Sequence, residues 1–341
     1  MITLKKKTNS LYLIKLFQLF LIIIFLYIFN TYYFSLSLNQ DRNIYDYLYQ
    51  KKRFNNELDY NNNFVIIRRK CIYCGLFSDY IVYLGCINDF INKGFVPIVD
   101  VKSYRNFYNG FKVNSSNINV WELFFEQPFG YKLNNVLLRA KKIKYFECTP
   151  KINRPSEAIF FNKILVDYWH NIQEHYSSIN IEILKEANMI RRHLFKGSNN
   201  VLGLLIRGTD YIARKPRNHP IPPTPTMFIK DLDKIKNNYK YDWFFLSTED
   251  DKIREIFIKQ YGYKLKYLIY KKLKYDYNKK QFLIFNTNIK NNIQYIKIYI
   301  LNIIVLSKCI DIMTAQTSGS IGVFILSDGF RFNKVYNLGK Y

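Results

Sequence analysis

The sequence predicts an α/β protein in which two α/β halves follow an N-terminal membrane segment. The α/β assignment depends on short apolar segments that alternate with longer helical patterns through short connections. This alternation occurs first from about residue 64 and returns after residue 200, which is the reason for expecting two halves. An uncharged apolar stretch at residues 16–38 predicts the membrane segment.

The uncharged stretch comes first along the chain. As a helix it would be about 34 Å long, enough to cross a hydrocarbon core of about 30 Å. Its second part is more polar, so a shallower interfacial anchor is the alternative. No small-residue cleavage pattern follows it, so we expect an uncleaved, single-pass anchor at residues 1–38 and a polar linker at residues 39–63. Basic residues flank the stretch on both sides and do not set its orientation.

The first α/β half begins after the linker. Residues 64–67 have the β-branched, apolar character of a buried strand, Gly75 offers a turn, and residues 79–92 follow as a helix. Gly94 ends that helix, and residues 95–100 supply a second strand. A strand, helix and strand with short connections indicate a parallel sheet. With a mainly helical stretch at residues 169–196, this half forms the predicted N-terminal domain, residues 64–196.

The second half repeats the alternation after a predicted hinge at residues 197–200. Its strands and helices follow one another with connections short enough for a second parallel sheet. This half is the predicted C-terminal domain, residues 197–341. The expected strands are 201–206, 243–247, 265–270 and 310–314, and the expected helices begin after Pro225 and span 250–261, 295–306 and the residues from Gly319.

Composition narrows the class of protein. Of the 341 residues, 49% are hydrophobic and 18% are aromatic, as in a packed globular protein. The formal net charge of +25 invites a nucleic-acid interpretation, but the basic residues are scattered and no recognition module is present, so we expect no nucleic-acid partner. An anionic membrane surface or a phosphate-bearing substrate would benefit equally from this charge.

The cysteines favour neither a disulfide framework nor a metal site. Their number, five, is odd and their spacing is irregular. Cys71 and Cys74 form a lone CxxC motif without a second pair or a neighbouring histidine, so zinc is not expected. We therefore expect the cysteines to be small buried apolar residues.

Polar residues follow three predicted strands of the second half, where open α/β sheets bind ligands and helix N-termini suit phosphate. The first such loop presents Arg207, Gly208, Thr209 and Asp210. The guanidinium of Arg207 suits a two-pronged grip on a diphosphate, and Gly208 permits close backbone approach. Asp210 would orient Arg207 or tie the loop down, and a surface salt bridge between the two is the alternative.

The other two loops combine hydroxyl groups with acidic or small residues. Successive backbone N–H groups at a helix start form a nest that can hold phosphate, whereas ordinary helix capping is the alternative interpretation. The second loop contains Thr248, Glu249 and Asp250, and the third contains Thr317, Ser318, Gly319 and Ser320.

These three loops resemble the three short motifs of fucosyltransferases that use GDP-fucose. Further segments resemble bacterial surface-polysaccharide glycosyltransferases of the same superfamily, and the resemblance covers roughly residues 66–341. The further segments are residues 75–78, 97–100, 121–128, 219–225 and 337–341.

The resemblance implies a GT-B architecture, with two facing Rossmann-like domains and the nucleotide sugar bound chiefly to the second. It implies an inverting transfer of a sugar, first of all fucose from GDP-fucose, to a glycan or lipid-linked glycan in surface polysaccharide biosynthesis. If the source is bacterial, the catalytic part would face the cytoplasm, where nucleotide sugars are made. Fixed cationic and N–H groups would take the place of a metal, so neither a metal nor a cofactor is expected.

The resemblance also assigns roles to residues. Arg207 would hold the donor β-phosphate and stabilise the leaving GDP, helped by Thr317 and Ser318. The implied donor-binding residues are Arg207, Gly208, Thr209, Asp210, His219, Thr248, Glu249, Asp250, Thr317, Ser318, Gly319 and Ser320. The implied residues of the cleft between acceptor and donor are Gly75, Ser78 and Gln127.

A catalytic base would come from the first half. Glu126 is the first candidate, with Asp79 and Glu122 behind it. The chain departs from the fucosyltransferase pattern where many members have a histidine, a second arginine and an acid; here these positions hold Leu205, Gly208 and Asn302. The departures support the alternative function, a membrane-anchored carbohydrate-binding or assembly protein that keeps the GT-B fold and has lost transfer.

Overall fold

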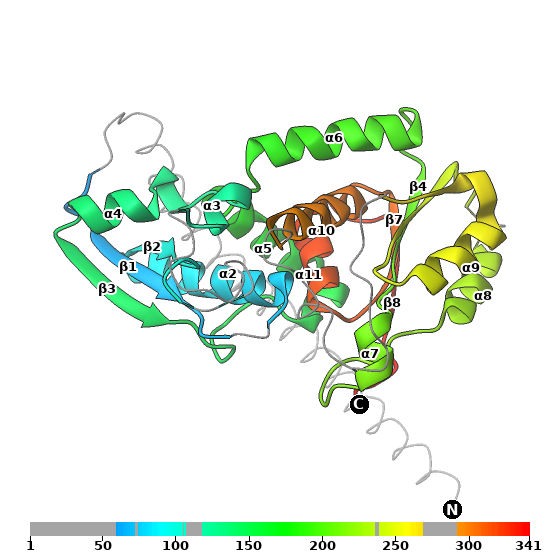
Figure 1. The fold of residues 1–341 in the computed structure, drawn as a ribbon, viewed down its shortest axis with the longest axis horizontal. Coiled ribbons are helices and arrows are strands. Elements are labelled where there is room, and N and C mark those ends of the chain that lie inside the picture. Colours follow the sequence, from blue (N-terminus) through cyan, green and yellow to red (C-terminus); the bar gives the residue numbers. More distant parts are fainter. Residues whose placement is uncertain (1–58, 72–73, 105, 107–117, 236–238, 269–291) are drawn as a thin grey trace, which may run out of the picture. The chain divides into compact units, whose positions relative to one another are not determined.

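The computed structural model describes residues 59–71, 74–104, 106, 118–235, 239–268 and 292–341 (Figure 1). The predicted anchor at residues 1–38 and nearly all of the linker lie outside the described residues. Residues Asp59–Tyr341 form one compact unit, which is described here by itself. None of the helices in the described ranges is both long enough and apolar enough to cross a membrane. The predicted domain boundary at residues 196 and 197 stays a prediction.

The first half contains a three-stranded parallel sheet in the order β2-β1-β3. The strands are β1 (Asn63–Arg68), β2 (Val96–Val99) and β3 (Lys142–Glu147), and helix α2 (Leu76–Asn92) joins β1 to β2. The strand, helix and strand unit predicted from the sequence is therefore present. The helices that complete this half are α3 (Trp121–Phe124), η1 (Pro128–Gly130), α4 (Leu133–Arg139), η2 (Glu157–Phe161), α5 (Lys163–Tyr176) and α6 (Ile181–Phe195).

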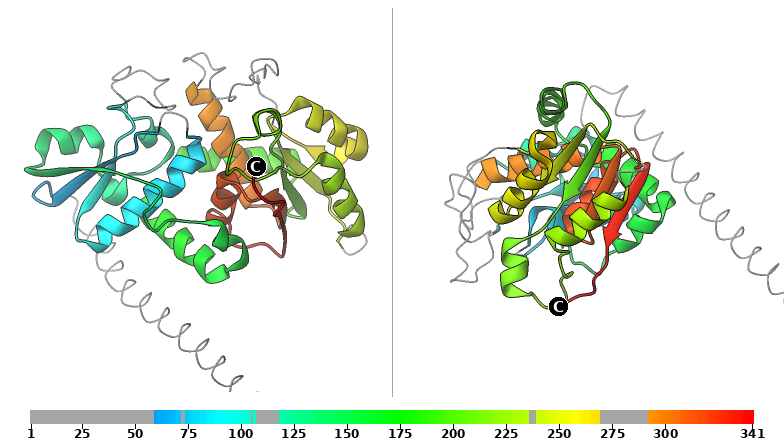
Figure 2. Two further views of the ribbon diagram at one scale, coloured as in Figure 1. Left: turned by 90° about the horizontal axis from the view of Figure 1, so that it is seen from below. Right: turned by 90° about the vertical axis from the view of Figure 1, so that its right-hand side faces the viewer.

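The second half contains a five-stranded parallel sheet in the order β6-β5-β4-β7-β8. Its strands are β4 (Val201–Leu205), β5 (Trp243–Ser247), β6 (Leu265–Lys266), β7 (Asp311–Ala315) and β8 (Phe332–Tyr336). Strand β8, at one edge of this sheet, is the red strand in the right-hand view of Figure 2. The helices are α7 (Thr209–Arg214), α8 (Pro225–Ile235), α9 (Asp251–Tyr261), η3 (Gly262–Lys264), α10 (Asn292–Ser307) and α11 (Ser318–Ile325).

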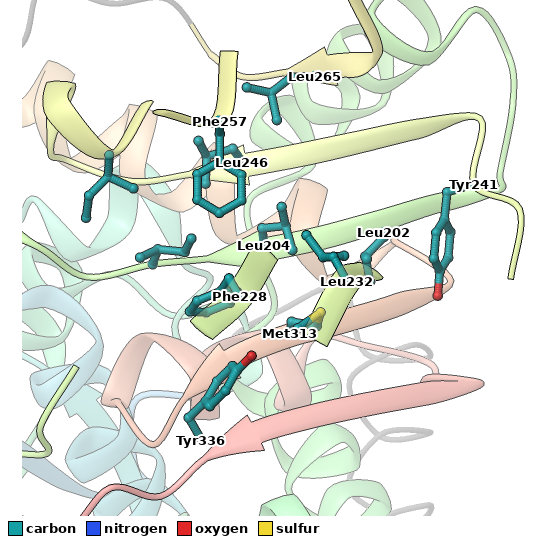
Figure 3. Packing of buried hydrophobic residues seen from close by; sticks show 12 residues of the cluster. Leu202, Leu204, Phe228, Leu232, Tyr241, Leu246, Phe257, Leu265, Met313 and Tyr336 are labelled. Carbon is teal, nitrogen blue, oxygen red and sulfur yellow. The ribbon is translucent and has the colours of Figure 1, made fainter. Parts of the chain in front are cut away.

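Helices cover both faces of the second sheet. Phe228 and Leu232 of α8 and Phe257 of α9 pack on one face, together with Leu202 and Leu204 of β4 (Figure 3). On the other face, a Cβ atom added to Gly203 would lie 3.0 Å from the Leu306 side chain of α10. Because both faces are covered, β4 is apolar throughout, as expected for a central strand of a parallel sheet.

The expectation that the cysteines are free buried residues is wrong for four of them. Cys71 is bonded to Cys74 in the connection between β1 and α2, and Cys86 of α2 is bonded to Cys148 after β3. The second pair is 62 residues apart in the sequence, and the parallel pairing of β1 with β3 brings its partners together. Cys309 is a free and buried thiol, as expected.

Helix α11 of the second half packs directly on α2 of the first. A Cβ atom added to Gly322 would lie 2.3 Å from the Phe77 ring, so the two helices meet without room for a side chain at position 322. The Phe77 ring also contacts Tyr299 of α10 edge-on, with 5.5 Å between ring centroids. From α5, His170 Nδ1 lies 2.7 Å from the backbone carbonyl oxygen of Ile325. These contacts join the two halves.

Because the Phe77 ring occupies the space beside Gly322, we expect Gly322→Ala to lower the free energy of unfolding by about 1–3 kcal/mol through overpacking. In the double variant with Phe77→Leu, the smaller side chain makes room for the methyl group, so the cost of Gly322→Ala should fall by more than half. Chemical denaturation of the four proteins of this cycle measures both effects. A Gly322→Ala protein as stable as the parent would contradict the packing described here.

Candidate functional site

A pocket of about 880 Å³ lies at the carboxyl ends of the central strands of the second sheet. It is lined from one side by the loops after β4, β5 and β7, and from the other by the connection between β1 and α2. The three loops predicted from the sequence therefore meet in one pocket, because β5, β4 and β7 are neighbours in the sheet. Of the predicted site residues, those that line it are Gly75, Ser78, Arg207, His219, Thr248, Glu249, Thr317, Ser318 and Gly319.

Arg207 is the second residue after β4, and its side chain is 31% exposed. The carbon at the centre of its guanidinium lies 4.6 Å from the centroid of the Tyr211 ring, a cation–π contact. Its Nε atom lies 3.6 Å from Oε1 of Glu249, which follows β5. Two neighbouring groups therefore fix the direction of a cation that reaches the pocket.

Glu249 holds the backbone of the Arg207 loop. Its Oε1 atom accepts hydrogen bonds from the Gly208 N–H at 2.7 Å and from the Thr209 hydroxyl at 3.1 Å. The sequence offered Asp210 as the partner of Arg207, but the described ion pair of Arg207 is with Glu249, and the side chain of Asp210 lies outside the described residues.

Asp250 supports the same loop from the start of α9. Its carboxylate accepts hydrogen bonds from the N–H groups of Lys252 and Ile253, which makes it the N-cap of the helix. It also accepts one from the Thr209 N–H at 3.1 Å. A Cβ atom at Gly208 would lie 2.7 Å from this side chain, so position 208 has no room for a larger residue. The absence of a second arginine at position 208 thus has a steric reason.

The third loop leads into α11. Thr317 is the N-cap, and its hydroxyl accepts the Ser320 N–H at 3.2 Å. The Ser320 hydroxyl is fully buried and donates to the Ala315 carbonyl at 2.6 Å, which explains why Ser320 does not line the pocket. Ser318 and Gly319 form the first turn, whose N–H groups have no intrahelical partner and favour an anion.

Tyr299 of α10 lies against this helix start. Its hydroxyl oxygen would be 2.5 Å from a Cβ atom at Gly319, so only glycine fits there. Burial raises the pKa of the Tyr299 hydroxyl to about 12, although the Arg207 guanidinium nearby partly offsets this rise. Tyr299 therefore stays neutral at physiological pH and can donate a hydrogen bond into the pocket.

Several predicted residues lie away from the pocket. Gln127 is buried and bonds the backbone of Val99, accepting from its N–H at 2.9 Å and donating to its carbonyl at 2.8 Å. Glu122 accepts hydrogen bonds from the Gln127 amide and the Leu133 N–H. Glu126 is partly exposed, 4.0 Å from Lys132, and does not line the pocket. The segment at residues 121–128 thus holds the backbone at the end of β2 in the first sheet.

The sequence-based reasoning missed other residues of the pocket. Arg154, which precedes η2, and Glu157, which begins it, both line the pocket. Tyr295 and Tyr299 line it from α10. Asn302, noted only as a departure, also lines it. Residue spacing gave no signal for Arg154 and Glu157, since no strand end or motif precedes them. The spacing of four residues between Tyr295 and Tyr299, which puts both on one face of α10, was the available signal for the two tyrosines.

Within the described residues, one group of three side chains has the composition of a metal site. It consists of Cys71, Cys74 and Asp79, whose ligand atoms lie within 4.8 Å of one another. The two thiols of this group are joined as a disulfide, so the sulfur atoms are not thiolate ligands in this state.

The hydrogen bonds to Glu249 generate a stability prediction. Glu249→Ala leaves the buried Gly208 N–H without its acceptor, so we expect the free energy of unfolding to fall by about 1–3 kcal/mol. Glu249→Gln keeps an amide oxygen in the same place and should cost less than half as much. Urea denaturation measures both, with Glu255→Ala on the exposed face of α9 as the control. Equal losses in the two Glu249 variants would show that the acceptor does not hold the loop.

No protein-family model matches the chain, and no curated protein matches it either. Among solved structures, the chain is similar to NodZ α-1,6-fucosyltransferase soaked with GDP-fucose, with 13% sequence identity and a TM-score of 0.45 over 78% of this chain and 93% of that one. It is similar to fucosyltransferase NodZ from Bradyrhizobium, with 12% identity and a TM-score of 0.45 over 78% and 94% of the two chains. It is also similar to NodZ α-1,6-fucosyltransferase co-crystallised with GDP, with 14% identity and a TM-score of 0.46 over 78% of this chain and 93% of that one. At these TM-scores we base the functional proposal on the residues of the pocket.

Proposed function

We propose that the protein is a glycosyltransferase that moves a sugar from a nucleoside diphosphate to a glycan acceptor. The observation that carries this proposal is the meeting of Arg207 with the start of α11 in one pocket. A site for a nucleotide sugar needs positive charge at the diphosphate. This positive charge matters most in the transition state, when the sugar departs and negative charge develops on the diphosphate.

The positive charge would come from protein groups that are already in position. Arg207 is oriented by Glu249 and Tyr211, and the first N–H groups of α11 belong to Ser318 and Gly319. Donors that are fixed before the reaction do not have to be reorganised as charge develops. We propose that these groups perform the task that a divalent ion performs in other transferases, so that the reaction needs neither a metal nor a cofactor.

The donor sugar and the setting belong to the same proposal. The resemblance of the three loops to fucosyltransferase motifs supports GDP-fucose as donor, transfer with inversion, and a GT-B arrangement. We propose that the acceptor, a glycan or lipid-linked glycan of a surface polysaccharide, enters beside Gly75 and Ser78.

The location of the protein is a further part of the proposal. We propose that residues 1–38 anchor it to a membrane and that, in a bacterial source, the catalytic part faces the cytoplasm. Disulfides persist mainly in oxidising compartments, and the two disulfides of this chain would instead favour the opposite side of the membrane, so the side is tested directly. Protease added outside intact spheroplasts should leave the catalytic part uncut, and digestion there would overturn this placement.

A screen of nucleotide sugars tests the enzymatic function. We expect GDP-fucose to raise the melting temperature more than GDP-mannose or UDP-sugars, because binding to the folded state stabilises it. Mass spectrometry of the reaction should then show loss of the donor with release of GDP. Glycan binding without any donor turnover would instead favour the carbohydrate-binding alternative.

Arg207 carries the sharpest prediction of this function. Arg207→Ala and Arg207→Lys should both lower turnover by about a hundredfold, since lysine keeps the charge but loses the paired donors of the guanidinium. Apparent donor affinity should change less than turnover if the arginine acts mainly in the transition state.

Steady-state kinetics beside melting temperatures measure these effects, with Arg192→Ala on the exposed surface of α6 as the matched control. A surface salt bridge with Glu249 alone would cost about 1 kcal/mol of stability and little activity. Near-normal turnover in Arg207→Ala would therefore overturn the assignment of the pocket.

A further inference from the structure

The CxxC motif has no part in the proposed transfer reaction, yet it lies on the wall of the same pocket. Cys71 and Cys74 are both partly exposed, both line the pocket, and are joined as a disulfide. Cys74 directly precedes Gly75, the N-cap of the 17-residue helix α2. A helix N-terminus stabilises a thiolate, which makes an adjacent cysteine a good leaving group in thiol exchange.

A buried carboxyl group stands next to this disulfide. The sulfur atoms of Cys71 and Cys74 and a carboxylate oxygen of Asp79 all lie within 4.8 Å of one another, close enough for a proton to pass through one water molecule. Asp79 is 2% exposed, and its Oδ1 accepts a hydrogen bond from Arg69 at 2.7 Å. The buried carboxyl group therefore lies beside a disulfide that lines the pocket.

Burial raises the pKa of Asp79 to about 8, because the loss of hydration outweighs the attraction of the Arg69 guanidinium. The charged or titratable groups that face it are Arg69 and the hydroxyl of Tyr104, whose own pKa is raised mainly by burial and in part by Asp79. Burial therefore favours the protonated carboxyl group, which can give its proton to a sulfur atom that becomes negative.

We propose that Cys71 and Cys74 form a redox-active site that exchanges with small thiols, and that Asp79 is the proton donor and acceptor of this exchange. The geometry that supports it is a pair of partly exposed sulfur atoms at a helix N-terminus with a buried carboxyl group within reach. This proposal does not rest on the proposed sugar transfer.

The exchange balances as a two-electron reaction with a dithiol such as dithiothreitol. A thiolate of the reagent attacks one protein sulfur, the bond between Cys71 and Cys74 breaks, and its electron pair goes to the departing sulfur, which takes the proton of Asp79. The second thiolate of the reagent then closes the cyclic disulfide and releases the other protein sulfur, which takes up a proton. The reagent releases its two thiol protons to solvent as its thiolates form, one cysteine takes the proton of Asp79, the other takes a proton from solvent, and Asp79 is reprotonated from solvent, so that two protons and two electrons are transferred in all.

The other disulfide supplies an internal control. Cys86 is 0% exposed and Cys148 is 2% exposed, so thiol reagents reach this bond poorly. The full chain is treated with dithiothreitol, quenched with a maleimide at several times, and digested for mass spectrometry. We expect the peptide with Cys71 and Cys74 to be reduced at least about tenfold faster than the peptides with Cys86 and Cys148.

Greater solvent access alone would also speed reduction of the bond between Cys71 and Cys74. A variant of Asp79 therefore provides the decisive measurement. Asp79→Asn keeps the shape of the side chain and removes its proton, and it should slow reduction of this pair by at least about tenfold without slowing that of Cys86 and Cys148. Equal rates for the two disulfides, or an unchanged rate in Asp79→Asn, would overturn the proposal.

A measurement on the unmodified chain covers the case in which Asp79→Asn fails to fold. The rate constant for Cys71 and Cys74, corrected for the thiolate fraction of the reagent, should fall as pH rises through about 8, where Asp79 loses its proton. A corrected rate that is constant between pH 6.5 and about 9.5 would rule out Asp79 as the proton donor.

Discussion

The carboxylate of Glu249 is the interaction on which the candidate site depends. It accepts the Gly208 N–H and the Thr209 hydroxyl and lies 3.6 Å from Nε of Arg207, so one side chain holds both the backbone and the cation of the loop. Glu249 can do this because Leu205 of β4 is paired with Ser247 of β5, which places the ends of the two strands at the same level. A shift in this register would separate the arginine from the group that orients it.

The same constraint explains the residues around Arg207. A loop held by two carboxylates must approach them closely, and Gly208 permits this because a Cβ atom would meet Asp250. The neighbouring side chains also limit how far Arg207 can turn, because the Tyr211 ring covers one side of its guanidinium. Glu249 partly neutralises the positive charge of a cation held in this way. The side chain, however, loses little conformational freedom when an anion binds. This arrangement suits a site that must stabilise charge as it develops more than one that must bind an anion as tightly as possible.

Elements buried on both faces of a sheet were predictable from the sequence, and exposed ones were not. Strands β4, β5 and β7 were recognised from their apolar runs, and their loops were placed in one site because parallel strands end at the same edge. Strand β3 was missed because most of its side chains are exposed, so that no apolar run marks it. Gln127 was placed near the cleft by resemblance and Glu126 as a carboxylate of the first half, but neither argument gives side-chain direction. The bond between Cys86 and Cys148 depends on a long-range contact that spacing along the chain cannot show.

Three consecutive residues at the start of α2 connect packing, pocket and buried charge. Phe77 fills the space beside Gly322, Ser78 lines the pocket, and Asp79 points into the first half, where it meets Arg69. Arg69 also donates to the backbone carbonyl of Ser78 at 2.6 Å, so the Asp79 carboxyl group and the pocket wall share one guanidinium. Because Phe77 leaves no room between α2 and α11, the start of α2 cannot slide along the second half without breaking that contact. A change of charge at Asp79 would therefore act on the pocket wall through Arg69 and Ser78, rather than through a movement of the two halves.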